Sequence, residues 1–216
     1  LKGKTLGIVG LGRIGREVIK RAIGMEMKIL GHDPFVNQDV FDPETVTLVD
    51  LDTLTKDSDY ITLHLPLLDA TKNLFDEERI STMKSTARII NVARGGIINE
   101  SDLANALNND IISGAAIDVF ELEPLDSNNP LINAKNILLT PHLGASTIEA
   151  KEGVAFSICN QIIDYFTKNK LTNGSVLRSR PVLSKNIIPL PGANLGIVIG
   201  PKSFFSFVRI HFEFTG

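Results

Sequence analysis

Short apolar runs alternate with amphipathic segments along most of the chain. The apolar runs are rich in β-branched residues, and they cover residues 5–9, 27–31, 60–65, 87–92, 114–120 and 137–140. Runs of this length that are apolar throughout are typical of strands buried on both faces of a parallel sheet. The pattern therefore predicts a parallel sheet that other elements cover on both sides.

Segments with helical spacing of apolar residues lie between these runs, at residues 13–23, 51–56, 77–83 and 100–108. Asn99 precedes the last of them, where its side chain is expected to cap the first turn. A longer amphipathic helix is predicted from residue 147 to about residue 168. Strands that alternate with helices predict an α/β fold, a doubly wound parallel sheet with helices on both faces.

The pattern changes near residue 172. Beyond it, prolines and clustered phenylalanines interrupt every regular period, and no order of helices or strands emerges. We therefore divide the sequence into a first domain, residues 1–172, and an irregular C-terminal tail, residues 173–216.

The first predicted strand runs into a glycine-rich turn, Gly10-Leu11-Gly12-Arg13-Ile14-Gly15. In such a turn the first glycine permits the tight bend, and the second lets the main chain approach a pyrophosphate. The third glycine lets the following helix pack close to the strand, and N–H groups at the helix start bind phosphate oxygens. The turn predicts a dinucleotide site of Rossmann type, although a glycine turn also serves packing alone.

Asp33 strengthens the dinucleotide interpretation. It lies just beyond the second apolar run and follows Gly15 by 18 residues, close to the spacing of about 20 at which an acid binds the adenosine ribose hydroxyls. A carboxylate there would repel a 2′-phosphate, so NAD is favoured over NADP. The alternative is that Asp33, which Pro34 follows, only begins a turn.

Three polar residues follow the carboxyl ends of three predicted strands: Arg94, Glu123 and His142. Ligands bind at that edge of an open parallel sheet. His142 would take the hydroxyl proton of a 2-hydroxy acid as hydride leaves its carbon, and Glu123 would orient the ring and favour the imidazolium. Arg94 would bind the substrate carboxylate. Taken singly, each could be an ordinary loop residue, but the three together with the dinucleotide turn favour a catalytic set.

The remaining candidates are weaker. His64 lies in a predicted strand and is interpreted as a core or edge histidine, while His32 and His211 have no evident partner. Cys159, the single cysteine, lies in a helical apolar pattern and is expected to be a buried, inert thiol. No metal-ligand spacing and no serine-nucleophile motif occurs, so no metal site is predicted.

The composition limits the classes of binding partner that are expected. The chain has 216 residues, 43% of them hydrophobic, and a formal net charge of −3 without a Lys/Arg run. Neither nucleic acid nor an anionic membrane is therefore an expected partner. The sequence opens directly on the first strand, and prolines break the late apolar stretch, which favours a cytoplasmic protein.

Several sequence blocks resemble those of the D-isomer-specific 2-hydroxyacid dehydrogenases. They are Gly7-Ile8-Val9-Gly10-Leu11-Gly12-Arg13-Ile14-Gly15-Arg16, Asn91-Val92-Ala93-Arg94-Gly95-Gly96, Ala116-Ile117-Asp118-Val119-Phe120-Glu121-Leu122-Glu123-Pro124 and Pro141-His142-Leu143-Gly144-Ala145-Ser146-Thr147. The resemblance implies that NAD is the cofactor and that Arg94, Glu123 and His142 are the catalytic residues. It also implies that Asp118 contacts the nicotinamide carboxamide, and that further cofactor contacts come from Arg13, Ile14, Asp33, Leu65, Pro66, Val92, Ala93, Arg94, His142, Leu143, Gly144 and Ala145.

Within the family, the last block most resembles the D-3-phosphoglycerate dehydrogenases. The resemblance therefore implies 3-phosphoglycerate as the substrate, a role in serine biosynthesis and a homo-oligomer. A hydroxypyruvate or glyoxylate reductase, or an NAD-sensing interaction protein of the co-repressor type, remains open. Family members carry a substrate-domain segment before the dinucleotide domain, and this sequence begins after it. We expect the chain alone to bind NAD but to turn substrate over slowly or not at all.

Overall fold

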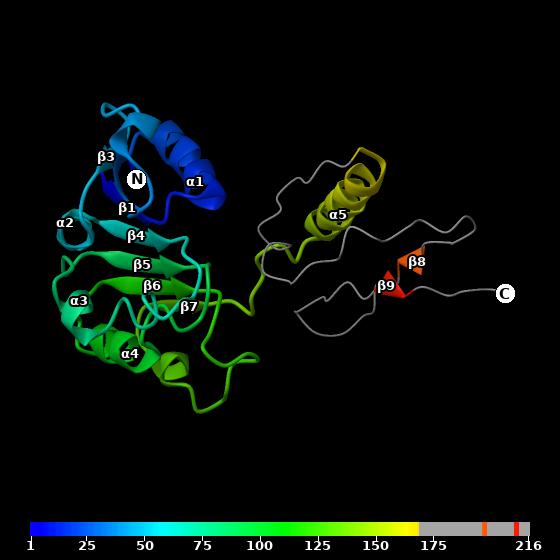
Figure 1. Ribbon diagram of the computed structural model, residues 1–216. Coiled ribbons are helices and arrows are strands. Elements are labelled where there is room, and N and C mark those ends of the chain that lie inside the picture. The colour runs from blue at the N-terminus through cyan, green and yellow to red at the C-terminus, as the bar shows by residue number, and fades with distance from the viewer. Residues whose placement is uncertain (169–195, 198–209, 212–216) are drawn as a thin grey trace. The chain divides into compact units, whose positions relative to one another are not determined.

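The computed structural model describes residues 1–168, 196–197 and 210–211 (Figure 1). The chain divides into two compact units, residues 1–154 and 155–216, and each is described by itself. In the second unit, two short strands, β8 (Gly196–Ile197) and β9 (Ile210–His211), pair antiparallel. The predicted domain boundary at residue 172 lies outside the described residues.

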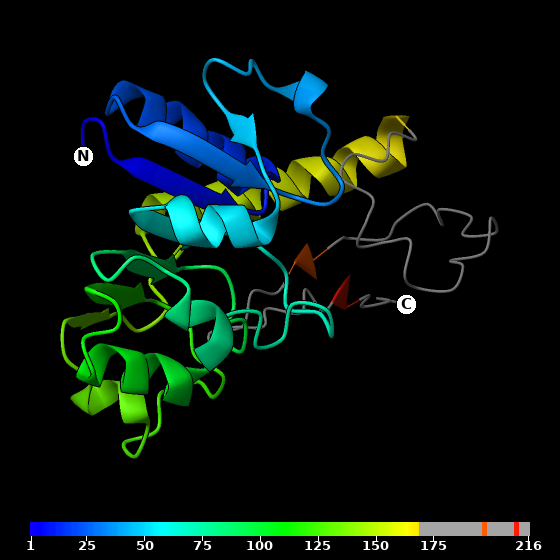
Figure 2. The same ribbon diagram turned by 90° about the vertical axis from the view of Figure 1, so that its left-hand side faces the viewer.

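A seven-stranded sheet forms the first unit, with the strand order β3-β2-β1-β4-β5-β6-β7 (Figures 1 and 2). Every neighbouring pair runs parallel, which confirms the predicted α/β fold. The strands are β1 (Thr5–Val9), β2 (Lys28–His32), β3 (Thr47–Leu48), β4 (Tyr60–Leu63), β5 (Arg88–Asn91), β6 (Gly114–Ile117) and β7 (Ile137–Leu139).

Helices cover both faces of this sheet. They are α1 (Arg13–Gly24), α2 (Leu51–Asp57), α3 (Glu77–Ser81) and α4 (Glu100–Asn108), and α5 (Ile148–Lys168) follows β7. Two 3-10 turns, η1 (Gln38–Val40) and η2 (Pro130–Asn133), complete the order. A Cβ added to Gly7 would meet Leu54 of α2, whereas the next side chain, Ile8, lies near Gly15 of α1. Because successive strand residues face opposite sides, α1 and α2 lie on opposite faces.

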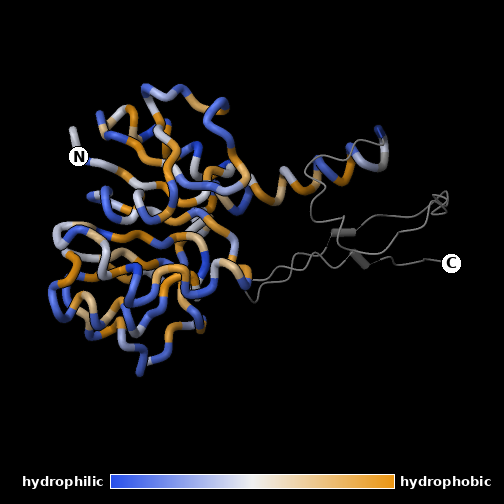
Figure 3. The backbone as a smooth tube through the Cα atoms, turned by 60° about the vertical axis from the view of Figure 1, so that its left-hand side comes forward, coloured by the Kyte–Doolittle hydropathy of each residue, from blue (hydrophilic) through white to orange (hydrophobic). Residues whose placement is uncertain are grey.

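Two apolar clusters bury the sheet. The smaller cluster, which includes Ile8, Ile19 and Ile29, lies on the α1 face. The larger cluster includes Leu54, Ile80 and Leu103 from the helices α2, α3 and α4. Figure 3 shows hydrophobic and hydrophilic stretches alternating along the backbone of this unit, as expected when apolar residues pack inside and polar residues face solvent.

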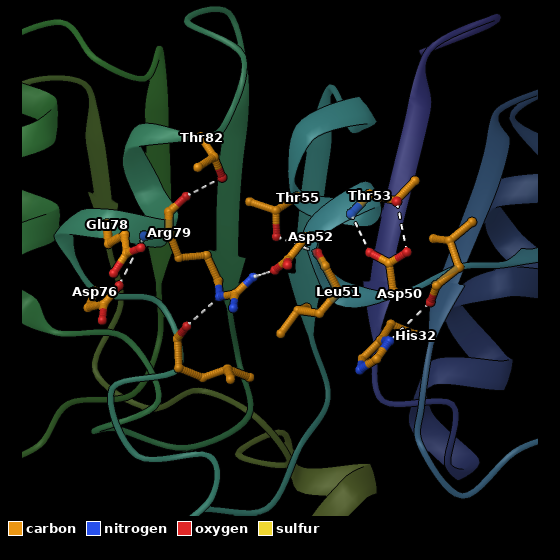
Figure 4. Close-up of polar contacts among 12 residues, drawn as sticks. His32, Asp50, Leu51, Asp52, Thr53, Thr55, Asp76, Glu78, Arg79 and Thr82 are labelled. Atoms are coloured by element: carbon orange, nitrogen blue, oxygen red, sulfur yellow. Dashed lines mark hydrogen bonds and ion pairs between the residues drawn. The ribbon is translucent and has the colours of Figure 1, made fainter.

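Polar contacts fix the starts of the short helices (Figure 4). Asp50 accepts a hydrogen bond from the Thr53 amide at 2.7 Å and begins α2. Arg79 of α3 donates to Asp52 of α2 at 2.7 Å, and the two side chains point toward one another between the helices. The predicted cap is also confirmed, because the Asn99 side chain accepts from two amides of the first turn of α4.

Some predictions were wrong in detail. The β3 strand was not predicted, although Val46, Leu48 and Val49 are apolar, and it forms only two residues of pairing at the sheet edge. The strand that was expected to extend to residue 65 ends at Leu63, so His64 follows the strand and does not lie in it. The predicted burial of Cys159 does not hold, since this thiol on α5 is only half-buried.

Candidate dinucleotide and catalytic site

The glycine-rich turn joins β1 to α1, and each glycine has a different environment. Gly10 has a φ of +95°, and an added Cβ would lie 2.5 Å from the His64 carbonyl oxygen. A Cβ on Gly15 would overlap the carbonyl oxygen of Gly10. A Cβ on Gly12, by contrast, would meet nothing within 4 Å. The first and third glycines are thus needed for packing, and the second leaves the main chain open to a ligand, as a pyrophosphate requires.

The turn lies where the strand order reverses. β1 continues toward β2 on one side, whereas β4 lies on its other side. The His64 amide donates to the Val9 carbonyl at 2.8 Å, so the chain after β4 runs beside the glycine turn. This segment carries Leu65 and Pro66 to the carboxyl edge of the sheet. Such a topological switch point is where open α/β sheets bind their ligands.

Asp33, which directly follows β2, contacts the same glycine-rich turn. Its Oδ2 accepts a hydrogen bond from the Leu11 amide at 2.9 Å, inside the glycine turn, and its Oδ1 accepts from Phe35 at 3.0 Å. Each carboxylate oxygen keeps a second lone pair, so the side chain can still accept from ribose hydroxyls. The α1 start adds no acidic side chain and no side-chain cap, which favours an anion there.

His142 and Glu123 are in direct contact. The Nδ1 atom of His142 lies 2.7 Å from Oε2 of Glu123, and both side chains are about 30% exposed, 28% and 32%. The other carboxylate oxygen of Glu123 accepts from the Phe120 amide at 3.1 Å. Since an ionised carboxylate can only accept, this contact requires a proton on Nδ1 of the ring.

Asp118 holds the loop that carries His142. Its Oδ1 accepts from the Thr140 hydroxyl at 2.6 Å and from the Leu143 amide at 2.7 Å, and its Oδ2 accepts from Gly144 at 3.0 Å. Burial raises the pKa of Asp118, but these hydrogen bonds outweigh it, so the pKa lies below its ordinary value. His142 has a φ of +54°, and this unusual conformation persists because the loop around it is anchored.

Arg94 follows β5 on a turn of its own. Asn91, which is 2% exposed, accepts from the Ala93 amide at 3.0 Å and donates to the Arg94 carbonyl at 2.9 Å. The guanidinium of Arg94 is exposed and donates to the Ala93 carbonyl at 2.6 Å. The structure therefore joins Glu123 and His142 directly, and it leaves Arg94 on the neighbouring loop.

The loops after β5 and β6 touch at Gly95. A Cβ there would overlap the Phe120 carbonyl and would come 2.5 Å from the Glu121 amide nitrogen. Only glycine permits this approach, which brings the turn of Arg94 against the turn of Glu123. The amide of Asp118 also donates to the Asn91 carbonyl at 3.0 Å, so the sheet itself fixes the two loops at their bases.

His64 is the other titratable group beside the turn. It is half-buried, and its Nε2 lies 3.1 Å from the Thr62 hydroxyl. Burial lowers the pKa of His64 below its usual value of 6.5. His32, at the end of β2, places Nδ1 3.0 Å from the Val49 carbonyl. The side chain of His211 lies outside the described residues.

The other predicted cofactor residues lie on the loops at the same edge. Several expose apolar side chains there, with 67% exposure for Ile14, 46% for Val92 and 54% for Leu143. Arg13 and Ile14 begin α1, Ala93 precedes Arg94, and Ala145 follows Gly144 with a φ of +59°. All belong to loops or helix starts that follow β1, β5 or β7.

Sequence reasoning missed the side chains that brace these loops. Asn91 and Thr140 each end or follow a strand with a polar side chain, and Glu100 starts α4 next to its cap. A polar residue inside an otherwise apolar run is the signal that could have identified Asn91. Nothing local identifies Glu100, because its contacts are more than 20 residues away.

Metal sites and membrane-spanning helices are both absent from the described part of the chain. No group of three or more His, Cys, Asp or Glu side chains there is placed to hold a metal ion. None of the helices described combines the length and the apolar character that crossing a bilayer requires.

Comparison with known proteins identifies the class. Residues 1–144 match the family described as "D-isomer specific 2-hydroxyacid dehydrogenase, NAD binding domain". The chain therefore belongs to the D-isomer specific 2-hydroxyacid dehydrogenase family, and this part of it is an NAD-binding domain. The open Gly12, the anion-compatible start of α1 and the carboxylate of Asp33 fit that cofactor.

Individual relatives differ in name. The chain is 51% identical over 161 residues to a D-3-phosphoglycerate dehydrogenase of Synechocystis sp., covering 74% of this chain and 29% of that protein. It is 42% identical over 196 residues to a glyoxylate reductase of Thermofilum pendens, covering 88% of this chain and 57% of that protein. The chain thus spans less than a third of the first relative and little more than half of the second.

Among solved structures, the NAD-dependent formate dehydrogenase of Staphylococcus aureus in complex with NAD superposes with a TM-score of 0.71. The two sequences are 31% identical, and the match covers 80% of this chain and 51% of that one. That protein binds NAD on a fold that this chain shares, which supports the same cofactor for the first unit.

Proposed function

We propose that this chain provides the NAD site and the acid–base residues of a D-2-hydroxyacid dehydrogenase, with 3-phosphoglycerate as the substrate. The observation that carries the proposal is the 2.7 Å contact between His142 and Glu123 at the ligand edge of the sheet. Similarity to a D-3-phosphoglycerate dehydrogenase over 74% of the chain supports the choice of substrate.

The role of each residue follows from its geometry. Nε2 of His142 accepts the proton of the 2-hydroxyl group, and it returns the proton when the 2-oxo acid is reduced. Glu123 holds Nδ1 and stabilises the imidazolium that forms, since a nearby opposite charge favours the protonated ring. The guanidinium of Arg94, which is exposed, binds the carboxylate of the substrate through its fork of donors.

Bound NAD supplies the hydride acceptor of this reaction. The chain would bind NAD at the carboxyl edge of the sheet, where the strand order reverses. The pyrophosphate would lie at Gly12 and the adenosine ribose at Asp33. Asp118 keeps the loop of His142 in place, and the resemblance to the family implies that it also contacts the nicotinamide carboxamide. The proposed cofactor contacts at Leu65, Pro66, Val92, Ala93, Leu143, Gly144 and Ala145 line the route between these ends.

The experiment is an assay of the 216-residue chain with NAD and 3-phosphoglycerate, alongside calorimetric titration with NADH. The substitution His142→Gln keeps a polar side chain but removes the base, and because the resemblance also implies a cofactor contact at His142, the NADH dissociation constant of the variant is measured alongside its turnover. Where turnover is measurable, it should fall by about 10²- to 10⁴-fold in the variant. Turnover that survives His142→Gln would refute the assigned role.

Glyoxylate and hydroxypyruvate are alternative substrates, supported by similarity to two reductases. The glyoxylate reductase of Thermofilum pendens matches 88% of this chain, and the hydroxypyruvate reductase of Thermotoga maritima matches 75% at 43% identity. The same acid–base pair can serve the 2-oxo acid substrates of all three kinds of enzyme, so it does not distinguish among them. Relative kcat/KM values for 3-phosphoglycerate, D-glycerate and glycolate separate the candidates, and the first is expected to be highest.

A further inference from the structure

The Glu100 side chain reaches from helix α4 to the loop that carries Glu123. Its Oε1 accepts a hydrogen bond from the Glu121 amide at 2.7 Å, and its Oε2 accepts from the Asn129 side chain. Asn129 in turn caps η2, accepting from the Leu131 amide at 2.9 Å. One carboxylate thus ties both ends of the loop between residues 121 and 129 to the same helix.

This tie acts on the turn that orients Glu123. The Glu121 amide donates to Glu100, and Gly95 packs directly against the peptide that joins Phe120 to Glu121. The Phe120 amide donates to Oε1 of Glu123, whose Oε2 contacts His142. A shift of this peptide would therefore carry the Glu123 carboxylate away from the imidazole.

We infer that Glu100 is a positioning residue, which acts through the Glu121 amide and Asn129 to hold Glu123 against Nδ1 of His142. The inference rests on the proposed function for its catalytic meaning, because it concerns the same acid–base pair. The inference can also be tested without measuring turnover. The contacts of Glu100 with the Glu121 amide and Asn129 should keep the His142 proton on Nδ1 when the ring is neutral. A free imidazole in water has no such partner and populates both tautomers.

The test measures that tautomer. In the unaltered chain, the ¹⁵N NMR shifts of the His142 ring nitrogens should report a neutral ring protonated at Nδ1. The variant Glu100→Ala should give a mixture of the two tautomers, because Glu123 is no longer held in place. Where turnover is measurable, kcat should fall by about tenfold to a hundredfold with the NADH dissociation constant unchanged.

Glu77 offers a matched control. It occupies the first position of α3, as Glu100 does in α4, and an acidic residue there interacts equally with its helix dipole. Within the described residues its carboxylate makes no hydrogen bond or ion pair. Glu77→Ala should therefore leave the His142 ring signals as they are.

A second pair of variants covers the case in which Glu100→Ala does not fold. Glu100→Asp keeps the charge at the helix start but is one methylene too short to reach the Glu121 amide, and Glu77→Asp is its control. The Asp variant at position 100 should also show mixed tautomers. A ring that stays protonated at Nδ1 in a folded Glu100 variant overturns the inference, as does an equal change in the Glu77 controls. If the tautomer shift appears but His142→Gln leaves a measurable turnover of the chain unchanged, the proposed function fails while the inference on Glu100 stands.

Discussion

Two titratable side chains, the half-buried His64 and the buried Asp118, show how single residues set the properties of the ligand edge. Each lies directly after a strand, at the carboxyl edge of the sheet. His64 has one hydroxyl partner, and burial lowers its pKa. Asp118 has three donors, and its pKa is lowered in spite of burial. Charge is therefore disfavoured on His64 and stabilised on Asp118, which leads to different effects of pH and mutation.

The stability of the chain should depend on pH through His64. The unfolded chain binds a proton at its ordinary pKa of 6.5, whereas the folded chain binds it only at a lower pH. Between these two values the unfolded state holds more protons, so the free energy of unfolding falls as the pH drops below 6.5. Urea denaturation at several pH values should show this fall reduced in His64→Gln. An identical pH dependence in both chains would contradict the prediction.

Removal of the Asp118 carboxylate should loosen the loop of His142. Asp118→Ala leaves the Leu143 and Gly144 amides without their acceptor, which should cost about 1–3 kcal/mol in the free energy of unfolding. Hydrogen exchange at both amides should become faster, while Thr140→Val, which removes only the hydroxyl donor, should have a smaller effect on them. Amide exchange that Asp118→Ala leaves unchanged would show that other contacts hold the loop.

At the scale of elements, different glycines of the glycine-rich turn serve helix packing and ligand binding. Gly15 brings α1 against β1 because a side chain there would overlap Gly10, whereas Gly12 faces open space with a φ of −68°. An L-residue adopts that φ without strain. The same turn therefore contains one glycine that the fold needs and one that only a ligand needs.

Two alanine substitutions test this separation. Gly12→Ala should leave the urea midpoint of the chain nearly unchanged but weaken NADH binding, because its methyl group occupies the space for the pyrophosphate. Gly15→Ala should lower the midpoint itself, since α1 must move away from the strand. Equal losses of stability in the two variants would mean that the turn has no open ligand position.

The sequence predicted most elements because buried parallel strands and their turns leave strong local patterns. The glycine turn, the cap at Asn99 and the end of β5 near Asn91 were each predicted from a few neighbouring residues. The strand predicted over residues 114–120 instead ends at Ile117, where Asp118 begins to bind the loop after β7. β3 was missed although its surroundings are β-branched and apolar, because only two of its residues pair with β2 and so short an edge strand is hard to distinguish from a loop.

The braces of the candidate site could not be predicted in the same way. Glu100 contacts residues 21 and 29 positions further along, and Asp118 contacts residues 22 to 26 positions further along. The geometry of such contacts depends on how β5, β6 and β7 align, and spacing in the sequence does not report it. The contact between Glu123 and His142 was expected only on the condition that the side chains reach one another, and the structure places them at 2.7 Å.

At the scale of the whole molecule, the exposed apolar residues of α5 bear on assembly. Phe156 is 72% exposed and Ile163 is 54% exposed, and exposed large apolar side chains often mark an interface. We propose that the chain forms a homo-oligomer, as its resemblance to the family implies. Light scattering should show a smaller average mass for Phe156→Ser than for the unaltered chain, whereas equal masses would argue against this helix as the interface.

The most direct test of the account is calorimetric titration of the chain with NADH and with NADPH. NADH is expected to bind more tightly, because Asp33 accepts the ribose hydroxyls and repels a 2′-phosphate. Asp33→Ala should remove that preference, while Asp39→Ala, on the exposed turn η1, should keep it. If the chain binds neither nucleotide, or if Asp33→Ala leaves the preference intact, the assignment of the dinucleotide site is contradicted.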